Sequence, residues 1–208
     1  ASIMKGIVDP IMQAGFNGIF VVVSNPMDVM TYLVWKYSGL PAEQVIGSGT
    51  VLDSARLRYK VSQKLNASPK SIHAYQVGEH GDTEFTLWST ADFGGTRLTR
   101  LLDANELEEI SEATKNEAYE IINKKGATYY GIGTCVNDIV NNIILNEKRV
   151  MPVSTYDAFT DSYYGFPAVI GRDGVIRRLE IQMSEVEGVK LQKSINAIKS
   201  AITEATAT

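Results

Sequence analysis

Two kinds of hydrophobic pattern alternate along the first part of the chain. Residues 2–14 carry apolar side chains at helical spacing, and residues 18–24 form a continuous apolar run rich in β-branched residues. A second helical pattern over residues 26–41 has a proline near its start and a Gly-Leu-Pro stop, and a short apolar run at 44–47 precedes a helix over about residues 50–65. Because helices and buried strands alternate, this region is predicted to form a parallel sheet covered on both faces.

The pattern changes after Ser71, where a second substructure is expected to begin. Two short strands, 71–77 and 84–90, are joined there by a glycine-rich loop. Asp103 and Ser184 each precede a glutamate at capping-box spacing, so each is expected to begin a helix. The remaining pattern predicts two helices, three strands and a closing helix, over residues 103–126, 127–148, 150–156, 164–171, 174–183 and 184–202.

Composition narrows the class of protein. The 208 residues carry a net charge of −4 with scattered basic residues, which argues against a nucleic-acid partner. The longest apolar run, 18–24, is far shorter than the roughly 20 residues of a membrane helix, and the first residues lack the features of a signal peptide. The single cysteine, Cys135, suits a reducing compartment and is interpreted as a buried structural residue. We expect a cytoplasmic protein with no membrane partner.

The beginning of the chain suggests that it is one part of a larger α/β enzyme. It opens on a helix whose strand partners would have to come earlier. No G-x-G-x-x-G motif follows a strand, so these residues contain no complete dinucleotide-binding loop.

His80 is the first candidate for chemistry, because it stands between glycines in GEHGDTEF. An imidazole can accept and return a proton near neutral pH if a carboxylate fixes its tautomer. Glu79 and Asp82 are neighbours in sequence, and Asp53 in a predicted helix is the better candidate for that carboxylate. The alternative is a loop histidine that is hydrogen-bonded to a backbone carbonyl.

Arg56 follows Asp53 by three residues, so the two side chains share a helix face. The guanidinium could bind the carboxylate of an acid substrate while Asp53 orients the histidine. An ordinary intrahelical ion pair is the competing interpretation.

Two further polar residues need separate explanations. Arg58 points away from the helix face of Asp53 and Arg56. Asn25 lies at the carboxyl end of a buried strand, where open α/β sheets bind ligands. A helix start at Asn-Pro is the simpler explanation of Asn25.

Five segments carry a specific resemblance that spans essentially the whole chain: SNPMD at 24–28, GLPAEQVIGSGTVLDSAR at 39–56, GEHGDTEF at 78–85, KKGATYYGI at 124–132 and PAVIGRDGV at 167–175. In order and spacing they resemble L-lactate dehydrogenase of the bacterial type. The resemblance implies an α/β fold, in which the C-terminal part of a Rossmann-type parallel sheet is followed by an α+β catalytic domain with antiparallel strands and long helices. It places the rest of the NAD-binding domain at 1–48 and the substrate-binding, catalytic domain at 49–208.

The resemblance also implies a role for each candidate. His80 would take the proton of lactate or return it to pyruvate, while a hydride passes between the substrate and NAD. Asp53 would stabilise the charged imidazole, and Arg56 would bind the substrate carboxylate. The glycines around His80 would leave room for substrate and cofactor. It further implies that Asn25 and Thr128 contact the substrate. The cofactor would be contacted by Val23, Asn25 and Ser48.

The same resemblance suggests an effector site. In allosteric bacterial members, an arginine and a histidine at the places of Arg58 and His73 meet their two-fold mates and bind fructose 1,6-bisphosphate. A homotetramer is therefore expected, with two cations per subunit facing two phosphates. An interface pair without a ligand is the alternative.

Departures from the family pattern limit what the chain is expected to do. The glycine-rich phosphate loop, the acidic residue that reads the ribose and the mobile substrate-selecting loop are absent, so the chain as given is expected to be inactive alone. Residues 152–171 look shorter than usual, and Glu117 occupies a place where a small residue is common.

Two other functions stay open. One is a related 2-hydroxy acid dehydrogenase for malate or L-2-hydroxyisocaproate, because the residue that separates lactate from malate most sharply belongs to the absent loop. The other is an inactive assembly module that keeps the catalytic fold, since half of the cofactor site is lacking.

Overall fold

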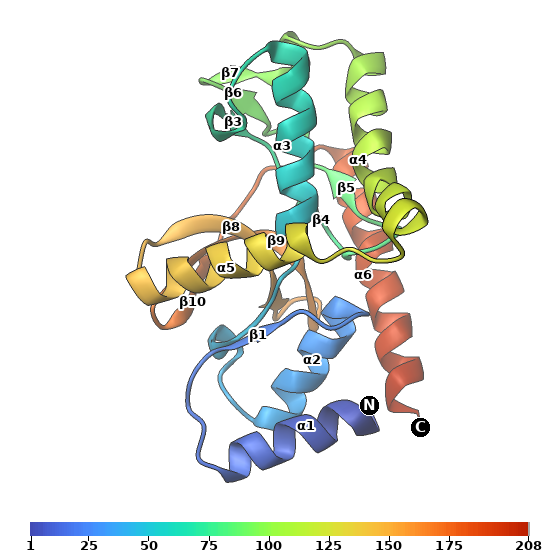
Figure 1. The fold of residues 1–208 in the computed structure, drawn as a ribbon. Coiled ribbons are helices and arrows are strands. Elements are labelled where there is room, and N and C mark those ends of the chain that lie inside the picture. The colour runs from blue at the N-terminus through green and yellow to red at the C-terminus, as the bar shows by residue number, and fades with distance from the viewer. Residues whose placement is uncertain (208) are drawn as a thin grey trace.

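A five-stranded mixed sheet runs through the middle of the computed structural model, which describes residues 1–207 (Figure 1). Its strand order is β1-β2-β8-β9-β10, and only β1 and β2 are parallel. The sheet is continuous because β2 pairs with β8 at Gly47 and Ser154. The predicted parallel sheet is thus confirmed for its first two strands, and antiparallel strands complete it. The bounds are β1 Phe20–Val22, β2 Val45–Gly47, β8 Arg149–Asp157, β9 Ser162–Gly171 and β10 Gly174–Arg178.

Six α-helices surround the sheet and extend beyond it (Figure 1). Asp103 and Ser184 each form a complete capping box, as predicted. Gly39 ends the second helix in the left-handed conformation at φ 66°, which favours glycine. All six predicted helices are found, with bounds that shift by a few residues. They are α1 Ser2–Gln13, α2 Met27–Ser38, α3 Val51–Leu65, α4 Ala104–Lys125, α5 Tyr130–Leu145 and α6 Glu185–Thr206.

Short strands form two small sheets near α3. The predicted strand 71–77 is divided into two, and each half pairs with a different partner. The hairpin of β6 and β7 was not predicted, and the predicted strand 174–183 ends at Arg178. The small strands are β3 Ile72–His73, β4 Gln76–Val77, β5 Phe85–Thr86, β6 Asp92–Phe93 and β7 Thr96–Arg97. Single 3₁₀ turns occur at η1 Ala42–Gln44, η2 Pro69–Ser71 and η3 Leu98–Arg100.

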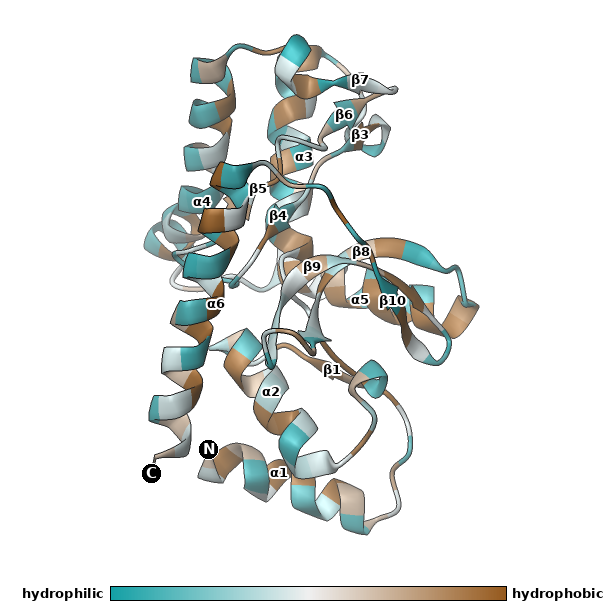
Figure 2. Ribbon diagram, turned by 180° about the vertical axis from the view of Figure 1, so that it is seen from behind, coloured by the Kyte–Doolittle hydropathy of each residue, from teal (hydrophilic) through white to brown (hydrophobic). Residues whose placement is uncertain are grey.

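The hydrophobic core consists of four clusters that tie the helices to the sheets. One lies between α3 and α4, a second between α5 and the strands β8 and β9, and a third between α6 and β9. The fourth joins α1, α2 and the first two strands. Figure 2 shows both hydrophilic and hydrophobic residues on each helix, as expected for helices with one buried face. Within residues 1–207, no helix combines the length and apolar character needed to cross a membrane.

Candidate active site

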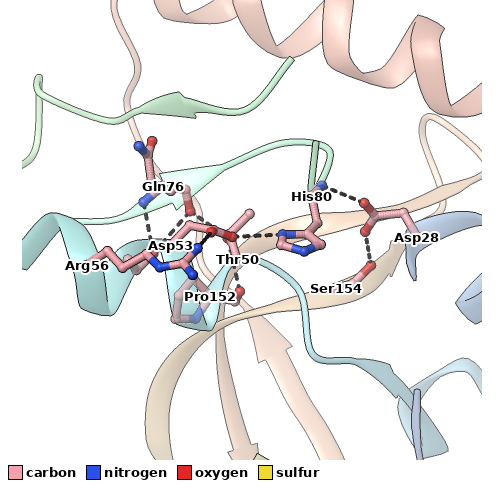
Figure 3. A network of polar contacts seen from close by, with 9 residues as sticks. Asp28, Thr50, Asp53, Arg56, Gln76, His80, Pro152 and Ser154 are labelled. Carbon is pink, nitrogen blue, oxygen red and sulfur yellow. Dashed lines mark hydrogen bonds and ion pairs between the residues drawn. The ribbon is translucent and has the colours of Figure 1, made fainter. Parts of the chain in front are cut away.

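His80 and Asp53 meet at the centre of the candidate site (Figure 3). The imidazole Nδ1 lies 2.8 Å from Asp53 Oδ2, although the two residues are 27 positions apart. Asp53 is in the first turn of α3 and is 4% exposed, whereas the His80 side chain is 28% exposed. The ring therefore has one nitrogen held by a buried carboxylate, and part of its surface remains accessible. The sequence-based pairing of these two residues agrees with this geometry.

Hydrogen bonds between α3 and β4 fix the two elements that carry the pair. Thr50 Oγ1 donates to the carbonyl of Gln76 at 2.6 Å (Figure 3). Ser54 Oγ accepts from the Gln76 backbone N–H at 2.9 Å. Beyond β4, the backbone of Gly78 exchanges two 2.8 Å hydrogen bonds with Gly165 on β9. The start of the His80 loop is therefore held by hydrogen bonds to α3 on one side and to β9 on the other.

The glycine at the start of the loop has a structural reason. Gly78 has φ +94°, and a Cβ there would lie 2.5 Å from Ser194 Oγ on α6. That hydroxyl accepts the backbone N–H of Glu79 at 2.7 Å. Close packing against α6 therefore accounts for Gly78, where sequence reasoning assigned the space to substrate and cofactor.

Asp28 is a buried residue of the site that sequence reasoning missed. Its Oδ2 accepts the backbone N–H of His80 at 2.8 Å, and its Oδ1 accepts the hydroxyl of Ser154 at 2.6 Å (Figure 3). Burial raises its pKa to about 6, against the opposing effect of the Ser154 and His80 hydrogen bonds. The only sequence signal was its place in the SNPMD segment. Asp28 connects α2, β8 and the histidine loop.

Arg56 shares the other oxygen of Asp53. Its Nη1 donates to Asp53 Oδ1 at 3.1 Å, so one carboxylate holds both the guanidinium and the imidazole. Arg56 and Thr128, two of the residues predicted to contact the substrate, line one cavity of about 180 Å³. Glu117 enters the same cavity wall, with Oε1 3.6 Å from Arg56 Nε.

Opposing effects set the charge of the His80 and Asp53 pair. Burial lowers the pKa of His80, but the hydrogen bond and negative charge of Asp53 outweigh it and raise the pKa to about 9. Burial likewise raises the pKa of Asp53, yet the contacts with His80 and Arg56 bring it below its usual value. The resting pair is therefore an imidazolium and a carboxylate, with Nδ1–H donating to Asp53.

Glu84 adds a second carboxyl group beside the pair. Burial and the charge of Asp53 raise its pKa to about 9, so it is protonated near neutral pH. Donor atoms of Asp53, His80 and Glu84 lie within 4.8 Å of one another, which is close enough to hold a metal ion. A proton on Glu84 and the ion pair beside it favour acid–base chemistry at this position. Sequence reasoning did not single out Glu84.

The residues proposed for the cofactor lie at the carboxyl ends of the two parallel strands. Val23 and Asn25 are exposed just after β1, with Asn25 joined to Pro26 by a cis peptide bond. Ser48 is buried just after β2, and its N–H donates to the carbonyl of Val22 at 2.8 Å. Asp28, three residues after Asn25, accepts the backbone N–H of His80, so this strand edge borders the histidine loop.

Arg58 and His73 line a cavity of about 480 Å³ that is separate from the site of His80 and Asp53. Lys70 and Arg149 also line it, and Arg149 is already paired with Asp138 at 2.6 Å. Burial lowers the pKa of Arg58. The structure thus brings the two predicted effector residues together at one cavity.

Cys135 is buried, as predicted, and burial raises the pKa of its thiol to about 11. A thiol of this pKa stays protonated near neutral pH, so it is a poor nucleophile.

A histidine oriented by a carboxylate, beside an arginine and a parallel strand edge, is the kind of site that 2-hydroxy acid dehydrogenases present. Two parts of one family match the chain. Residues 1–47 match the NAD binding domain of lactate/malate dehydrogenase, and residues 50–208 match its alpha/beta C-terminal domain. The chain belongs to the lactate/malate dehydrogenase family, and the resemblance seen in the sequence is confirmed.

Individual relatives give the same result. The chain is 46% identical to the L-lactate dehydrogenase of Latilactobacillus sakei, over 98% of this chain and 66% of that protein. It is 43% identical to the L-lactate dehydrogenase of Bacillus pumilus, over 97% of this chain and 67% of that protein. The chain therefore spans about two thirds of the length of these curated relatives.

Solved structures extend the comparison. The minor L-lactate dehydrogenase of Enterococcus mundtii superposes with a TM-score of 0.95 at 39% identity, covering 98% of this chain and 68% of that one. The malate dehydrogenase of Aeropyrum pernix superposes with a TM-score of 0.92 at 33% identity, covering 98% of this chain and 70% of that one. The fold is thus shared by the lactate and malate branches of the family.

Proposed function

We propose that the protein containing this chain is an NAD-dependent L-lactate dehydrogenase that interconverts lactate and pyruvate. The observation that supports this most directly is the 2.8 Å contact of His80 with Asp53, whose other oxygen holds Arg56. A group that moves a proton and a group that binds a carboxylate are thereby fixed relative to each other. The relatives named L-lactate dehydrogenase support lactate as the substrate.

In this proposal each side chain has a separate task. The Arg56 guanidinium binds the substrate carboxylate, with the Thr128 hydroxyl on the same cavity wall. The protonated Nε2 of His80 donates its proton to the carbonyl oxygen of pyruvate, and in the reverse direction the deprotonated Nε2 takes the hydroxyl proton of lactate. Asp53 keeps Nδ1–H in place and stabilises the imidazolium, which holds the proton until pyruvate needs it.

The cofactor residues fit a nicotinamide ring. Val23 offers an exposed apolar surface and Asn25 an exposed amide at the carboxyl ends of parallel strands, where open α/β sheets bind ligands. Ser48 holds the adjacent backbone through its N–H. When bound there, NAD would supply the hydride acceptor for the C2 hydrogen of lactate.

The proposal includes a division of labour between residues 1–48, as the remainder of the NAD-binding domain, and residues 49–208, as the substrate-binding and catalytic domain. We also propose that the protein acts in the cytoplasm. The single cysteine, which is buried, suits a reducing compartment.

A steady-state assay of the full-length protein tests the function. We expect NADH-dependent reduction of pyruvate to exceed that of oxaloacetate and of the branched keto acid 4-methyl-2-oxopentanoate, which corresponds to L-2-hydroxyisocaproate. His80→Gln should lower kcat/KM by about 10² to 10⁴, the usual range for a proton-transfer group. Arg56→Lys keeps the charge but loses the planar fork and should raise KM. The matched control is Arg100→Lys, since Arg100 is exposed in η3.

Each other outcome identifies an alternative. Faster reduction of oxaloacetate or of the branched keto acid would assign the protein to the malate or the L-2-hydroxyisocaproate enzymes. If no 2-keto acid is reduced, the inactive assembly module is the better interpretation.

A second proposal concerns the cavity of Arg58 and His73. We propose that it binds fructose 1,6-bisphosphate as an effector within a homotetramer. The supporting observation is that three basic side chains, Arg58, Lys70 and His73, line one cavity of about 480 Å³. Phosphate groups require such cation-lined surfaces.

Isothermal titration of the full-length protein with fructose 1,6-bisphosphate tests the effector. We expect binding below millimolar concentration, and its loss in the double variant Arg58→Gln/His73→Gln but not in Arg100→Gln. Sedimentation of the same samples should show a tetramer. Wild-type protein without binding below millimolar concentration contradicts the effector, and a monomer contradicts the assembly.

A further inference from the structure

Glu117 places a carboxylate in the cavity that contains the proposed substrate-binding arginine. Its side chain, on α4, is 28% exposed and lines the 180 Å³ cavity beside Arg56 and Thr128. The contact to Arg56 Nε is 3.6 Å, which is too long for a hydrogen bond and is therefore an ion pair. The Arg56 side chain is only 8% exposed, so this charge interaction is poorly screened by water.

Lys60 holds Glu117 in this position. Its Nζ lies 2.8 Å from Glu117 Oε2, a distance typical of a charge-assisted hydrogen bond. Lys60 is one turn further along α3 than Arg56. The four side chains alternate in sign from Asp53 through Arg56 and Glu117 to Lys60.

Lys125 also lines the cavity, but the guanidinium of Arg56 has acidic neighbours of its own. Asp53 engages Nη1 of Arg56 and Glu117 faces its Nε, so acidic groups already lie on two sides of the guanidinium. A substrate with one carboxylate must compete with Glu117 for Arg56. A substrate with a second carboxylate, or with a bulky side chain, must also fit beside the Glu117 carboxylate in a small cavity.

We propose that Glu117 is a specificity-determining residue that restricts the cavity to small 2-keto acids with a single carboxylate. The proposal rests on the lactate dehydrogenase function proposed above, because it assumes that Arg56 binds the substrate. Glu117 excludes dicarboxylates by charge repulsion and branched acids by its volume. Lys60 fixes the position of the carboxylate and partly offsets its charge.

Two variants of Glu117 separate charge from volume in the full-length protein. Glu117→Gln keeps the shape and removes the charge, so it should raise the kcat/KM for oxaloacetate relative to that for pyruvate by about tenfold, as expected for two like charges about 6 Å apart at a half-buried site. It should also lower the KM for pyruvate, because Glu117 no longer competes for Arg56. Glu117→Ala should in addition raise the relative kcat/KM for the branched keto acid.

Glu120→Gln is the matched control, since Glu120 lies on the same helix with 66% side-chain exposure and pairs with Lys124, away from the cavity. It should leave both substrate ratios at the wild-type values. Thermal unfolding of each variant confirms that it is folded. Lys60→Met gives a second test, because it removes the cation that partly neutralises Glu117 and should therefore lower the relative kcat/KM for oxaloacetate, in the direction opposite to Glu117→Gln.

The possible outcomes distinguish the two proposals. If the wild-type protein reduces pyruvate but folded Glu117→Gln and Lys60→Met both keep its substrate ratio, the role of Glu117 is wrong and the proposed function stands. If the wild-type protein reduces no 2-keto acid, the proposed function itself fails.

Discussion

Asp28 is buried at 3% exposed surface and reaches two segments that are far from it in sequence. It accepts hydrogen bonds from the backbone of His80 and from the hydroxyl of Ser154, 52 and 126 positions away. Its hydrogen bond to the histidine loop fixes the backbone that carries the imidazole ring. We therefore regard Asp28 as a positioning residue.

Two substitutions at this residue should differ sharply. Asp28→Asn can still accept from the His80 N–H while its amide donates to Ser154, so we expect a loss of less than about 1 kcal/mol. Asp28→Ala leaves a buried N–H and a buried hydroxyl without a partner, which should cost about 2–4 kcal/mol. Urea unfolding measures both values. Equal effects of the two variants would mean that these hydrogen bonds contribute little.

Asp53 controls the proton on His80. The pKa of His80 is raised to about 9 mainly because the Asp53 hydrogen bond and charge outweigh burial. In Asp53→Asn the charge is gone and burial acts with less opposition, so we expect the pKa of His80 to fall towards or below its usual value of about 6.5.

NMR titration of the ring protons measures this shift directly. The chain has only two histidines, and His73→Gln assigns their signals. A His80 pKa that stays near 9 without the carboxylate would contradict the role given to Asp53.

At the scale of elements, the helices were predictable because their signals are local. Asp103 with Glu106 and Ser184 with Glu187 mark two helix starts within four residues of sequence. The division of residues 71–77 into β3 and β4 was not predictable in this way, because it depends on distant partners in β6 and β5. The β6–β7 hairpin did carry a local signal, since Gly94 and Gly95 both have positive φ at its turn.

The site shows the same difference between local and distant information. Asp53 and Arg56 were predictable as a pair because helical spacing places them on one face. The pairing of Asp53 with His80 was suggested by chemistry, since a histidine needs a carboxylate. Asp28 and Glu84 gave no comparable signal, because their importance comes from burial beside residues of other elements.

The contact between the histidine loop and α6 yields a prediction for two glycines. Gly78→Ala would place a Cβ 2.5 Å from Ser194 Oγ at a φ of +94°, so overpacking and backbone strain should destabilise the fold by about 2–4 kcal/mol. Gly188→Ala in α6 meets nothing within 4 Å and should stabilise by about 0.5–1 kcal/mol, because alanine favours the helix. Chemical denaturation of both variants tests the two signs. A Gly78→Ala protein as stable as the wild type would show that the loop can move away from α6.

For the whole molecule, one buried and two partly buried groups bind protons more tightly in the folded state than in the unfolded chain. The pKa of His80 is raised from 6.5 to about 9, that of Glu84 from 4.5 to about 9, and that of Asp28 from 3.8 to about 6. Stability falls with rising pH wherever the folded state holds more protons than the unfolded state. The contribution of Asp28 is therefore lost by about pH 6, and those of His80 and Glu84 are lost as pH approaches 9.

The free energy of unfolding should consequently decrease between pH 6.5 and 9, by on the order of 2 kcal/mol after allowance for the partial exposure of His80. The lowered pKa of Asp53 has the opposite sign, but its contribution is complete above its unfolded value of 3.8, so it does not cancel this decrease. Urea unfolding at several pH values across this window measures the slope. The decisive comparison is Glu84→Gln, whose amide has nearly the shape of the protonated carboxyl group and cannot ionise. This variant should lose less stability than the wild type between pH 7 and 9, and an unchanged slope would show that Glu84 does not hold its proton in the folded state.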